Sequence, residues 1–415
     1  MTSPEEISKA VSQWLDDNWD QDLSLTEWRN ILVDSSWATP HWPEAYFGRG
    51  FTTEQSAIVG RIFSERGIVP VAQTGPRRLA AETILAEGND QQKRRYLRPI
   101  LTGEESWCQL FSEPGSGSDL AGLSTKAEFI DGKWIINGQK VWNTSAHHAD
   151  FGILVARTDW DVPKHQGISF FLIDMRQKGV EVRQLKQMNG HASFNEVFMT
   201  DAVVAAEDLV GKEGDGWAIA KTTLSYERRL GGVGRSFGSV QAEKLGRVHD
   251  EYAKELEVAN EPYTWYPQRQ GRLDLVLPRA RETGAINDPS VRQEIARLFC
   301  MQKGAGLASA AAEAKRKSGS NELVPAGSIG KLAASVIARQ AAKVHTMISG
   351  SDAMRSGPDS AEEGMIAEVL VSVPAISIAG GTDEIQRNII SERVLGMPKE
   401  MRADTGPFRD IKRND

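Results

Sequence analysis

The chain has 415 residues and a formal net charge of −7, so it is long enough for two or three domains and carries no basic surface of the kind that binds nucleic acid. The first residues lack the basic and apolar regions of a signal peptide, and no run approaches about 18 consecutive apolar residues, so we expect neither a signal peptide nor a membrane span. Cys108 and Cys300 lie far apart in the sequence, which favours reduced thiols and a cytoplasmic protein over a disulfide framework.

Helical patterning dominates the first part of the chain. Apolar residues recur at the spacing of one helix face, as at Ile7, Val11 and Leu15. Turn residues separate the patterned segments, and the character of the sequence changes near Glu105. We therefore expect an N-terminal α-helical domain over residues 1–105, with helices at 5–15, 26–33, 53–66, 77–87 and 91–101.

Short segments rich in Val, Ile and Phe follow. Two of them, 126–130 and 133–136, are joined by Asp131 and Gly132, the residue pair typical of a tight hairpin turn. No alternation of strands with helices is present, so a nucleotide-binding parallel sheet is not expected. The pattern predicts a central antiparallel β domain over 106–212, a barrel or sandwich, with further strands at 152–156, 168–173, 180–185 and 195–198.

Helical patterning returns after Gly216 and predicts a C-terminal helical bundle domain over 213–415. Asp288 followed by Pro289 is a good helix start, and Thr382 should cap the last long helix. The expected helices cover 291–317, 329–348, 362–373 and 382–395.

An aromatic and proline-containing run at 261–267 interrupts these helices. We interpret the surrounding stretch, 252–281, as a loop or lid-like insertion, and the sequence assigns it no function. With helices, then strands, then helices again, the fold class is α+β.

Two segments combine small residues with an aromatic ring. Residues 111–119 read Phe-Ser-Glu-Pro-Gly-Ser-Gly-Ser-Asp, where the backbone must bend and approach something closely. Residues 137–145 follow, in which Trp142 could stack on a flat ring while Thr144 hydrogen-bonds to it. Either segment alone could equally be a structural turn or a buried tryptophan; together, in this order, they favour a site for a flat polar ring. No spacing of Cys, His or carboxylate residues predicts a metal site.

These motifs give the chain a resemblance to the acyl-CoA dehydrogenases along nearly its whole length. The motifs, in family order, are Ser-Glu-Pro-x-x-Gly-Ser-Asp at 112–119, Asn-Gly-x-Lys-x-Trp-x-Thr at 137–144 and Gly-Gly-Thr-x-Glu-Ile-x-Arg at 380–387. The resemblance implies a helical domain, a β domain and a four-helix bundle, with FAD held where they meet. It places near FAD, with Ser118 also near the acyl-CoA, the residues Phe111, Ser112, Gly117, Ser118, Trp142, Thr144, Thr382 and Glu384.

The resemblance also implies the reaction, in which a carboxylate removes the α-proton of an acyl-CoA thioester as the flavin accepts a hydride from the β-carbon. Many members carry this carboxylate in a Glu-Gly-Thr motif, but here Gly380 occupies its place and could still polarise the thioester carbonyl through its backbone N–H. Other members carry it in a Leu-x-x-Glu-Arg motif, which Glu227 matches, with Tyr226 and Arg228 beside the substrate. From these residues alone, an exposed helix face with ordinary ion pairs is the alternative.

Two family motifs that normally serve across a subunit interface, Arg-x-x-Phe-Gly and Gln-x-x-Gly-Gly-x-Gly, have no clean match. This resembles the actinobacterial members that work as α2β2 heterotetramers, several of them in steroid side-chain degradation. We therefore expect a bulky, branched or steroid-side-chain acyl-CoA, in lipid metabolism of the β-oxidation type, with electrons passed to an electron-transfer flavoprotein. The alternatives are an oxygen-reactive variant (an acyl-CoA oxidase or flavin monooxygenase) and a non-catalytic partner subunit.

Overall fold

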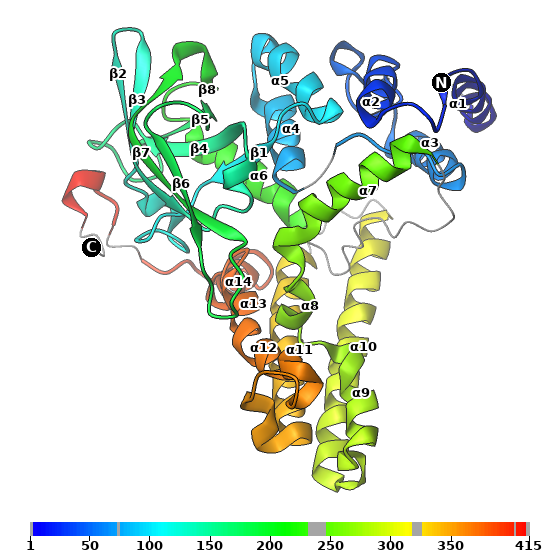
Figure 1. The fold of residues 1–415 in the computed structure, drawn as a ribbon. Coiled ribbons are helices and arrows are strands. Elements are labelled where there is room, and N and C mark those ends of the chain that lie inside the picture. Colours follow the sequence, from blue (N-terminus) through cyan, green and yellow to red (C-terminus); the bar gives the residue numbers. More distant parts are fainter. Residues whose placement is uncertain (1–2, 73–74, 231–245, 318–325, 402–403, 412–415) are drawn as a thin grey trace.

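The computed structural model describes residues 3–72, 75–230, 246–317, 326–401 and 404–411. Figure 1 shows a β-sheet and a group of N-terminal helices side by side in an upper body, with a helical bundle extending below them. This arrangement confirms the expected α+β fold. The expected domain boundaries, at 105/106 and 212/213, stay predictions.

Five helices form the N-terminal part, and four of them begin at a residue that caps them. Ser3, Ser24, Thr52 and Asn89 each accept a hydrogen bond from the backbone three residues on, and the Glu or Gln at that position bonds back to the cap. The apolar faces then pack into one core, which includes Trp28. The helices are α1 (Pro4–Asn18), α2 (Leu25–Asp34), α3 (Thr53–Glu65), α4 (Gly75–Glu87) and α5 (Asp90–Thr102).

The central part is one eight-stranded sheet that is mostly antiparallel, in the order β6-β7-β3-β2-β4-β5-β8, with β1 parallel to β4. Asp131 and Gly132 both have positive φ, as the predicted hairpin turn requires. Strands β4 and β5 are buried on both faces. One face of each strand packs against the N-terminal helices, and the opposite face of each packs into a second core. The strands are β1 (Trp107–Leu110), β2 (Lys126–Ile130), β3 (Lys133–Val141), β4 (Phe151–Arg157), β5 (Ile168–Asp174), β6 (Val180–Leu185), β7 (Phe194–Ala205) and β8 (Leu209–Val210).

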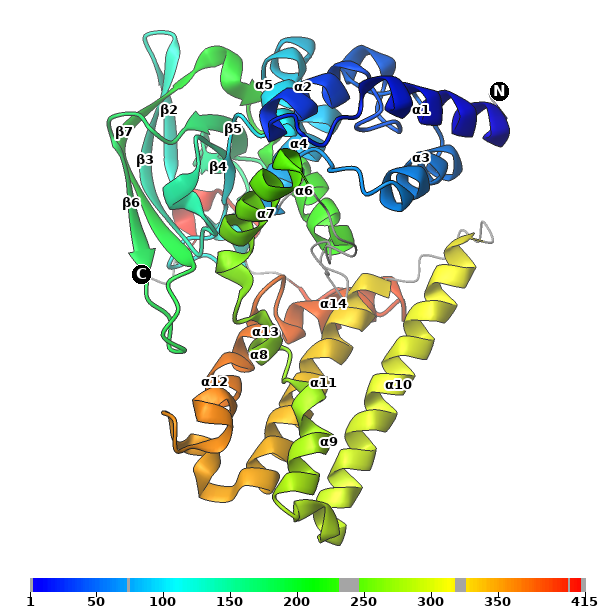
Figure 2. The ribbon, with the colours of Figure 1, turned by 45° about the vertical axis from the view of Figure 1, so that its right-hand side comes forward.

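The C-terminal helices divide between the two bodies of the molecule. In Figure 2, α6 (Gly216–Leu230) and α7 (Arg247–Asn260) lie against the upper body, while α9 to α12 form the lower bundle. The bundle core joins α9 (Leu273–Glu282), α10 (Pro289–Lys317) and α11 (Ala326–Ser349) through residues such as Val276, Leu298 and Val344. The last helices are α12 (Met365–Ser372), α13 (Pro374–Ile378) and α14 (Asp383–Arg393).

Two expectations for this region differ from the structure. The stretch 252–281 is not a loop: it contains the end of α7, the turn η5 (Glu261–Tyr263), α8 (Tyr266–Arg269) and α9. The helix expected at 362–373 begins at Met365, because Glu362 and Glu363 have left-handed backbone angles. Both differences lie where tertiary packing, rather than local periodicity, determines the backbone.

One stretch of the described chain, Ala361–Arg393, is long and apolar enough to cross a membrane by length and composition, and an 18-residue window within it has a mean hydropathy of 1.6. It is divided, however, among the turn η8 (Ala361–Gly364), α12, α13 and α14. Val369 and Val373 of this stretch pack on Ala338 of α11. The absence of a membrane span therefore stays a prediction.

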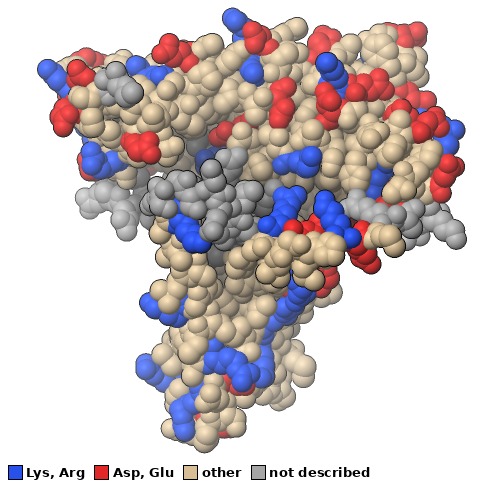
Figure 3. All heavy atoms as spheres, turned by 180° about the vertical axis from the view of Figure 1, so that it is seen from behind, with Lys and Arg blue, Asp and Glu red and all other residues tan. Residues whose placement is uncertain are grey.

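Charge is unevenly distributed over the face seen in Figure 3. Lys and Arg side chains predominate over the lower bundle, whereas Asp and Glu are concentrated over the upper body. The acidic net charge of the whole chain thus coexists with a basic bundle surface.

Candidate functional site

The two segments singled out in the sequence lie side by side at the end of β3. The backbone N–H of Val141 donates to the carbonyl of Ser112 at 2.9 Å. The Lys140 ammonium donates to the carbonyl of Phe111 at 3.0 Å and forms an ion pair with Glu113 at 2.8 Å. The side chain of Lys140 is fully buried and that of Glu113 is 6% exposed. A buried ion pair therefore joins the two motifs.

The Glu113 carboxylate is held in its charged form. Burial alone would raise its pKa, but the neighbouring Lys140 ammonium and several hydrogen bonds lower the pKa of Glu113 to about 2. It accepts hydrogen bonds from the backbone of Ser124 at 2.7 Å and of Thr125 at 2.9 Å. The sequence did not reveal this pair, because both residues stood inside motifs with no sign that they touch.

Trp142 occupies a β-bulge. Val141 pairs with Glu196, and Asn143 exchanges backbone hydrogen bonds of 3.1 Å with Asn195, so Trp142 has no residue opposite it. Its φ is +64°, a left-handed conformation that costs a residue other than glycine about 1 to 2 kcal/mol. The bulge turns the indole outward, and the residue is 56% exposed.

The surroundings of Trp142 fit a flat ring that carries both donors and acceptors. Ser112, which pairs with Val141, and Thr144, two positions after Trp142, are both half-buried. Asn143 Oδ1 and Ser193 Oγ are buried and have no hydrogen-bond partner among the described residues. An exposed indole with hydroxyl residues and unpaired polar atoms beside it offers the stacking surface and the hydrogen-bonding groups that suit an isoalloxazine.

Gly117 and Ser118 form the exposed tip of the neighbouring loop. Glu113 and Ser116 exchange backbone hydrogen bonds of 3.0 Å, which closes the turn before this tip. A Cβ at Gly117 would meet nothing within 4 Å. The tip is thus open to a ligand, and its contact with FAD stays a prediction.

Glu227 lies near the C-terminal end of α6, on the helix face that packs against α4. One helical turn earlier, the fully buried Thr223 hydroxyl lies 3.0 Å from the hydroxyl of Thr83 on α4. Glu227 is half-buried, and Tyr226 packs against the main core. The side chain of Arg228 lies outside the described residues.

Gly380 and Gly381 form a left-handed turn between α13 and α14, with φ of +67° and +85°. Gln386 donates from its side-chain amide to both carbonyls at 3.2 Å, which fixes the turn. A Cβ at Gly380 would meet nothing within 4 Å. Figure 2 shows α6 ending above α14. The helix end that carries Glu227 and the turn that carries Gly380 therefore both lie where the upper body meets the bundle.

The start of α14 follows the sequence expectation for helix capping. Thr382 is the N-cap, and its hydroxyl accepts from the backbone N–H of Ile385 at 3.3 Å. The side chain of Glu384 is 76% exposed and pairs with Arg387 at 3.3 Å. Both residues therefore have local roles, and a contact with FAD stays a prediction.

The sequence gives no sign that Asp383, the first residue of α14, has a special role. Its buried carboxylate accepts a hydrogen bond from Ser335 at 2.8 Å and pairs with Lys331 at 3.3 Å and Arg339 at 3.1 Å, all on α11. Burial would raise the pKa of Asp383, but these partners lower it. Asp383 thereby anchors the Gly380 turn to the bundle.

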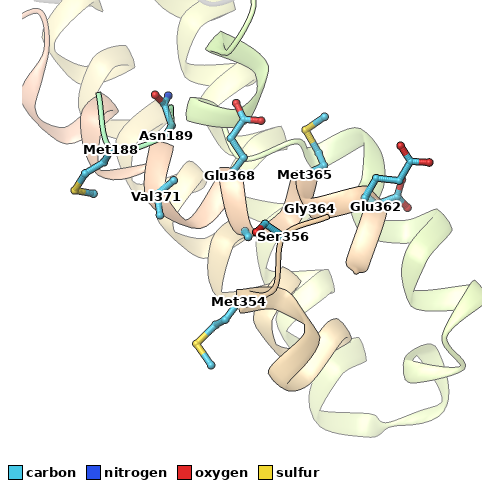
Figure 4. A pocket seen from close by; sticks show the side chains of 11 residues that line it. Met188, Asn189, Met354, Ser356, Glu362, Gly364, Met365, Glu368 and Val371 are labelled. Atoms are coloured by element: carbon cyan, nitrogen blue, oxygen red, sulfur yellow. The ribbon is translucent and has the colours of Figure 1, made fainter. Parts of the chain in front are cut away.

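A groove of about 570 Å³ lies apart from these residues, where the β6–β7 loop meets α12 (Figure 4). Its lining includes Met188 and Asn189 of the loop and Glu368 of α12. The predicted site residues lie elsewhere, so the groove is not part of the candidate site.

Comparison with known proteins supports the same assignment along the chain. Family models describe the acyl-CoA dehydrogenase N-terminal domain at residues 4–104, the middle domain at 108–202 and the C-terminal domain at 270–395. Acyl-CoA dehydrogenase IpdE1 of Mycobacterium tuberculosis is 30% identical, with 97% of this chain and 100% of the relative covered. Acyl-CoA dehydrogenase FadE34 of the same organism is 36% identical over 89% of this chain, which spans only 46% of that relative's length.

Solved structures show the same fold. Glutaryl-coenzyme A dehydrogenase in complex with glutaryl-CoA gives a TM-score of 0.62 at 23% identity, covering 97% of this chain and 96% of that one. The ChsE4–ChsE5 complex from Mycobacterium tuberculosis gives a TM-score of 0.60 at 22% identity, covering 96% and 98%. With the family matches, the fold and the flavin-compatible site around Trp142, the chain belongs to the acyl-CoA dehydrogenases, a family of FAD-dependent oxidoreductases.

Proposed function

We propose that this chain converts a saturated acyl-CoA to its trans-2-enoyl-CoA, with Glu227 as the catalytic base. The observation that carries the proposal is the outward-facing Trp142, held beside the segment of Phe111 and Ser112 by the buried pair of Glu113 and Lys140. FAD, when bound, supplies the hydride acceptor of this reaction. Phe111, Ser112, Thr144 and the loop tip at Gly117 and Ser118 would hold it against the indole, with Thr382 and Glu384 on the bundle side.

The chain's own residues would activate the substrate. The Glu227 carboxylate takes the α-proton, and the backbone N–H of Gly380 donates to the thioester carbonyl, which stabilises the negative charge that develops on its oxygen. Tyr226 and Arg228 flank the base and would contact the thioester side of the substrate. Burial of Glu227 on the α4-facing side of α6 gives it a partly desolvated environment, which suits a general base.

We further propose a bulky, branched or steroid-side-chain acyl group. The open space at Gly380 leaves room where many members carry the glutamate side chain. Similar folds include the Tcur3481–Tcur3483 steroid ACAD, with a TM-score of 0.62 at 21% identity, and the ChsE4–ChsE5 complex. These two-component names support a heteromeric assembly. We propose a heterotetramer with this chain as its catalytic subunit, and a cytoplasmic location.

An electron-transfer flavoprotein is the proposed electron acceptor. A relative 31% identical over 46% of this chain is subunit CarC of the caffeyl-CoA reductase–Etf complex of Acetobacterium woodii. A chain in a solved structure named for the electron transferring flavoprotein of Acidaminococcus fermentans also has this fold, with a TM-score of 0.59 at 20% identity. An oxygen pulse after anaerobic reduction by substrate tests this choice, because rapid flavin reoxidation would instead indicate an oxidase or monooxygenase.

Glu227→Gln tests the proposed base. Glutamine keeps the size of the side chain but cannot accept the proton, so the variant should retain FAD and lose at least about 100-fold in the rate of flavin reduction by substrate. Stopped-flow bleaching under anaerobic conditions, with straight-chain, branched and steroid-side-chain CoA esters, measures this rate and also identifies the acyl class. Glu257→Gln, on the exposed face of α7, is the matched control. Near-normal reduction by Glu227→Gln would exclude this residue as the base, and a colourless wild-type protein would favour the non-catalytic subunit.

A further inference from the structure

Residues 261–270, which form η5 and α8, have no role in the reaction described above. At their centre is Trp265, which is only 1% exposed and is among the largest fully buried side chains of the described chain. Aromatic residues also lie on both sides of it in the sequence, at Tyr263 and Tyr266. So large a buried ring directly before a four-residue helix indicates that its packing partners come from elsewhere in the fold.

Those partners lead directly to the flavin site. The ring of Trp265 meets that of Phe194 edge to face, with centroids 6.2 Å apart at 80°. Phe194 in turn meets Trp142 edge to face, at 5.7 Å and 88°. Edge-to-face geometry at these separations is the favourable arrangement of aromatic pairs. One intermediate ring therefore connects the buried Trp265 with the exposed Trp142.

Trp265 is itself held from the outer side. Its ring contacts Tyr266 at 5.1 Å, and the Arg269 guanidinium lies 4.0 Å from the Tyr266 ring and 5.6 Å from the Trp265 ring. The indole Nε1 is buried without a hydrogen-bond partner among the residues that the structure describes. An unpaired donor is unfavourable in a buried position, so the ring's size and shape, not its polarity, account for tryptophan here.

The backbone that carries Phe194 is fixed to the same part of the molecule. Asn189 donates to the Ser372 hydroxyl at 3.1 Å, and His191 Nε2 lies 3.0 Å from the Glu368 carboxylate, both on α12. His191 also stacks on Trp265, with centroids 6.4 Å apart. Phe194, the first residue of β7, thus lies between a loop anchored to the bundle and the bulge at Trp142.

We infer that Trp265 is a positioning residue for the flavin: through Phe194 it holds the Trp142 indole in the orientation that receives the isoalloxazine. This inference rests on the proposed role of Trp142 in binding FAD. The segment 261–270 then lies between the bundle and the β domain. Through Trp265, it links the contacts made by α12 to the orientation of Trp142 in the cofactor site.

The test measures FAD binding in the absence of substrate. Deflavinated wild-type protein, Trp265→Ala, Trp265→Phe and Phe194→Leu are titrated with FAD, and the visible circular dichroism of the bound flavin is recorded. Loss of an aromatic pair should weaken FAD binding about tenfold in Trp265→Ala and Phe194→Leu and reduce the flavin dichroism, since the indole is no longer held. Trp265→Phe should bind as the wild type does, because it keeps an edge-to-face ring and removes only the unpaired N–H.

The controls separate positioning from general destabilisation. Trp37→Ala removes another buried tryptophan, one that packs on Phe51 in the N-terminal helices, and should leave FAD affinity unchanged. Wild-type affinity and dichroism in both Trp265→Ala and Phe194→Leu would overturn the inference, as would an equal loss in Trp37→Ala. If Trp265→Ala does not fold, Phe194→Leu alone decides. Failure of the wild type itself to bind FAD would instead refute the proposed function.

Discussion

The buried pair of Glu113 and Lys140 allows a quantitative prediction. In Glu113→Gln the Lys140 ammonium stays fully buried and keeps the Phe111 carbonyl as a contact, but it loses the carboxylate that balances its charge. The interval between the ordinary pKa of 4.5 and the value of about 2 in the folded protein corresponds to about 3 kcal/mol, at 1.36 kcal/mol per pH unit. Removal of one partner of a buried ion pair typically costs about 3 to 5 kcal/mol. We therefore expect the free energy of unfolding to fall by about 3 kcal/mol at neutral pH.

The pH dependence has a defined sign. Because the pKa of Glu113 is lower in the folded state, its stabilising contribution is fully present above pH 4.5 and is lost as the pH falls from 4.5 towards 2. The difference in unfolding free energy between the wild type and Glu113→Gln should shrink over that window, since glutamine resembles the protonated acid. Denaturant unfolding followed by circular dichroism at several pH values measures it, and retained FAD reports on the site.

Two controls define what would refute this reasoning. Glu128→Gln breaks the exposed pair with Lys126, an ion pair of 2.7 Å, and should change the unfolding free energy by less than about 1 kcal/mol. Glu113→Gln combined with Lys140→Met removes both charges and should recover most of the lost stability. A loss below about 1 kcal/mol in the single variant, or no recovery in the double variant, would show that the pair does not hold the motifs together.

Two further predictions concern the expected catalytic segments. Gly380→Glu, introduced into Glu227→Gln, should raise the rate of flavin reduction at least about tenfold above that of Glu227→Gln alone. The reason is that the space at Gly380 is open to a side chain and the left-handed backbone costs only about 1 to 2 kcal/mol. A double variant that keeps FAD but recovers no activity would contradict the expectation that a carboxylate at either position reaches the same substrate carbon. Thr223→Val should lower the free energy of unfolding by about 1 to 3 kcal/mol, since it leaves the buried Thr83 hydroxyl unpaired, and Thr83→Val in addition should recover most of it. Chemical denaturation of both variants checks this prediction, and a neutral Thr223→Val would contradict it.

Local signals were sufficient for much of the fold. The hairpin at Asp131 and Gly132, the helix start at Pro289 and the cap at Thr382 were all predicted, because each depends on residues within a few positions of one another. Helix existence followed from the spacing of apolar residues, while the strand over 194–205 was predicted only in part, since its burial depends on both neighbouring strands.

The sequence could not reveal features that depend on distant contacts. Glu113 and Lys140 lie 27 positions apart, and their pairing follows from the register of β3 against the preceding loop. The stretch around Trp265 reads as a loop because its aromatic and proline residues have no helical periodicity. Its position depends on the distant ring of Phe194 in β7, which packs on Trp265. The role of Asp383 could not be predicted, because its charged partners Lys331 and Arg339 come from α11, more than 40 positions earlier in the chain.

The bulge at Trp142 has a consequence for how the protein acquires its cofactor. The indole is already turned outward in the folded chain, with its ring set by Phe194 and its backbone fixed between Val141 and Asn143. Ordering a side chain during association typically costs about 0.5 to 1.5 kcal/mol, and here that ordering occurs when the chain folds. Loss of FAD would then leave the docking surface intact, so that a protein stripped of its flavin could be reloaded without refolding.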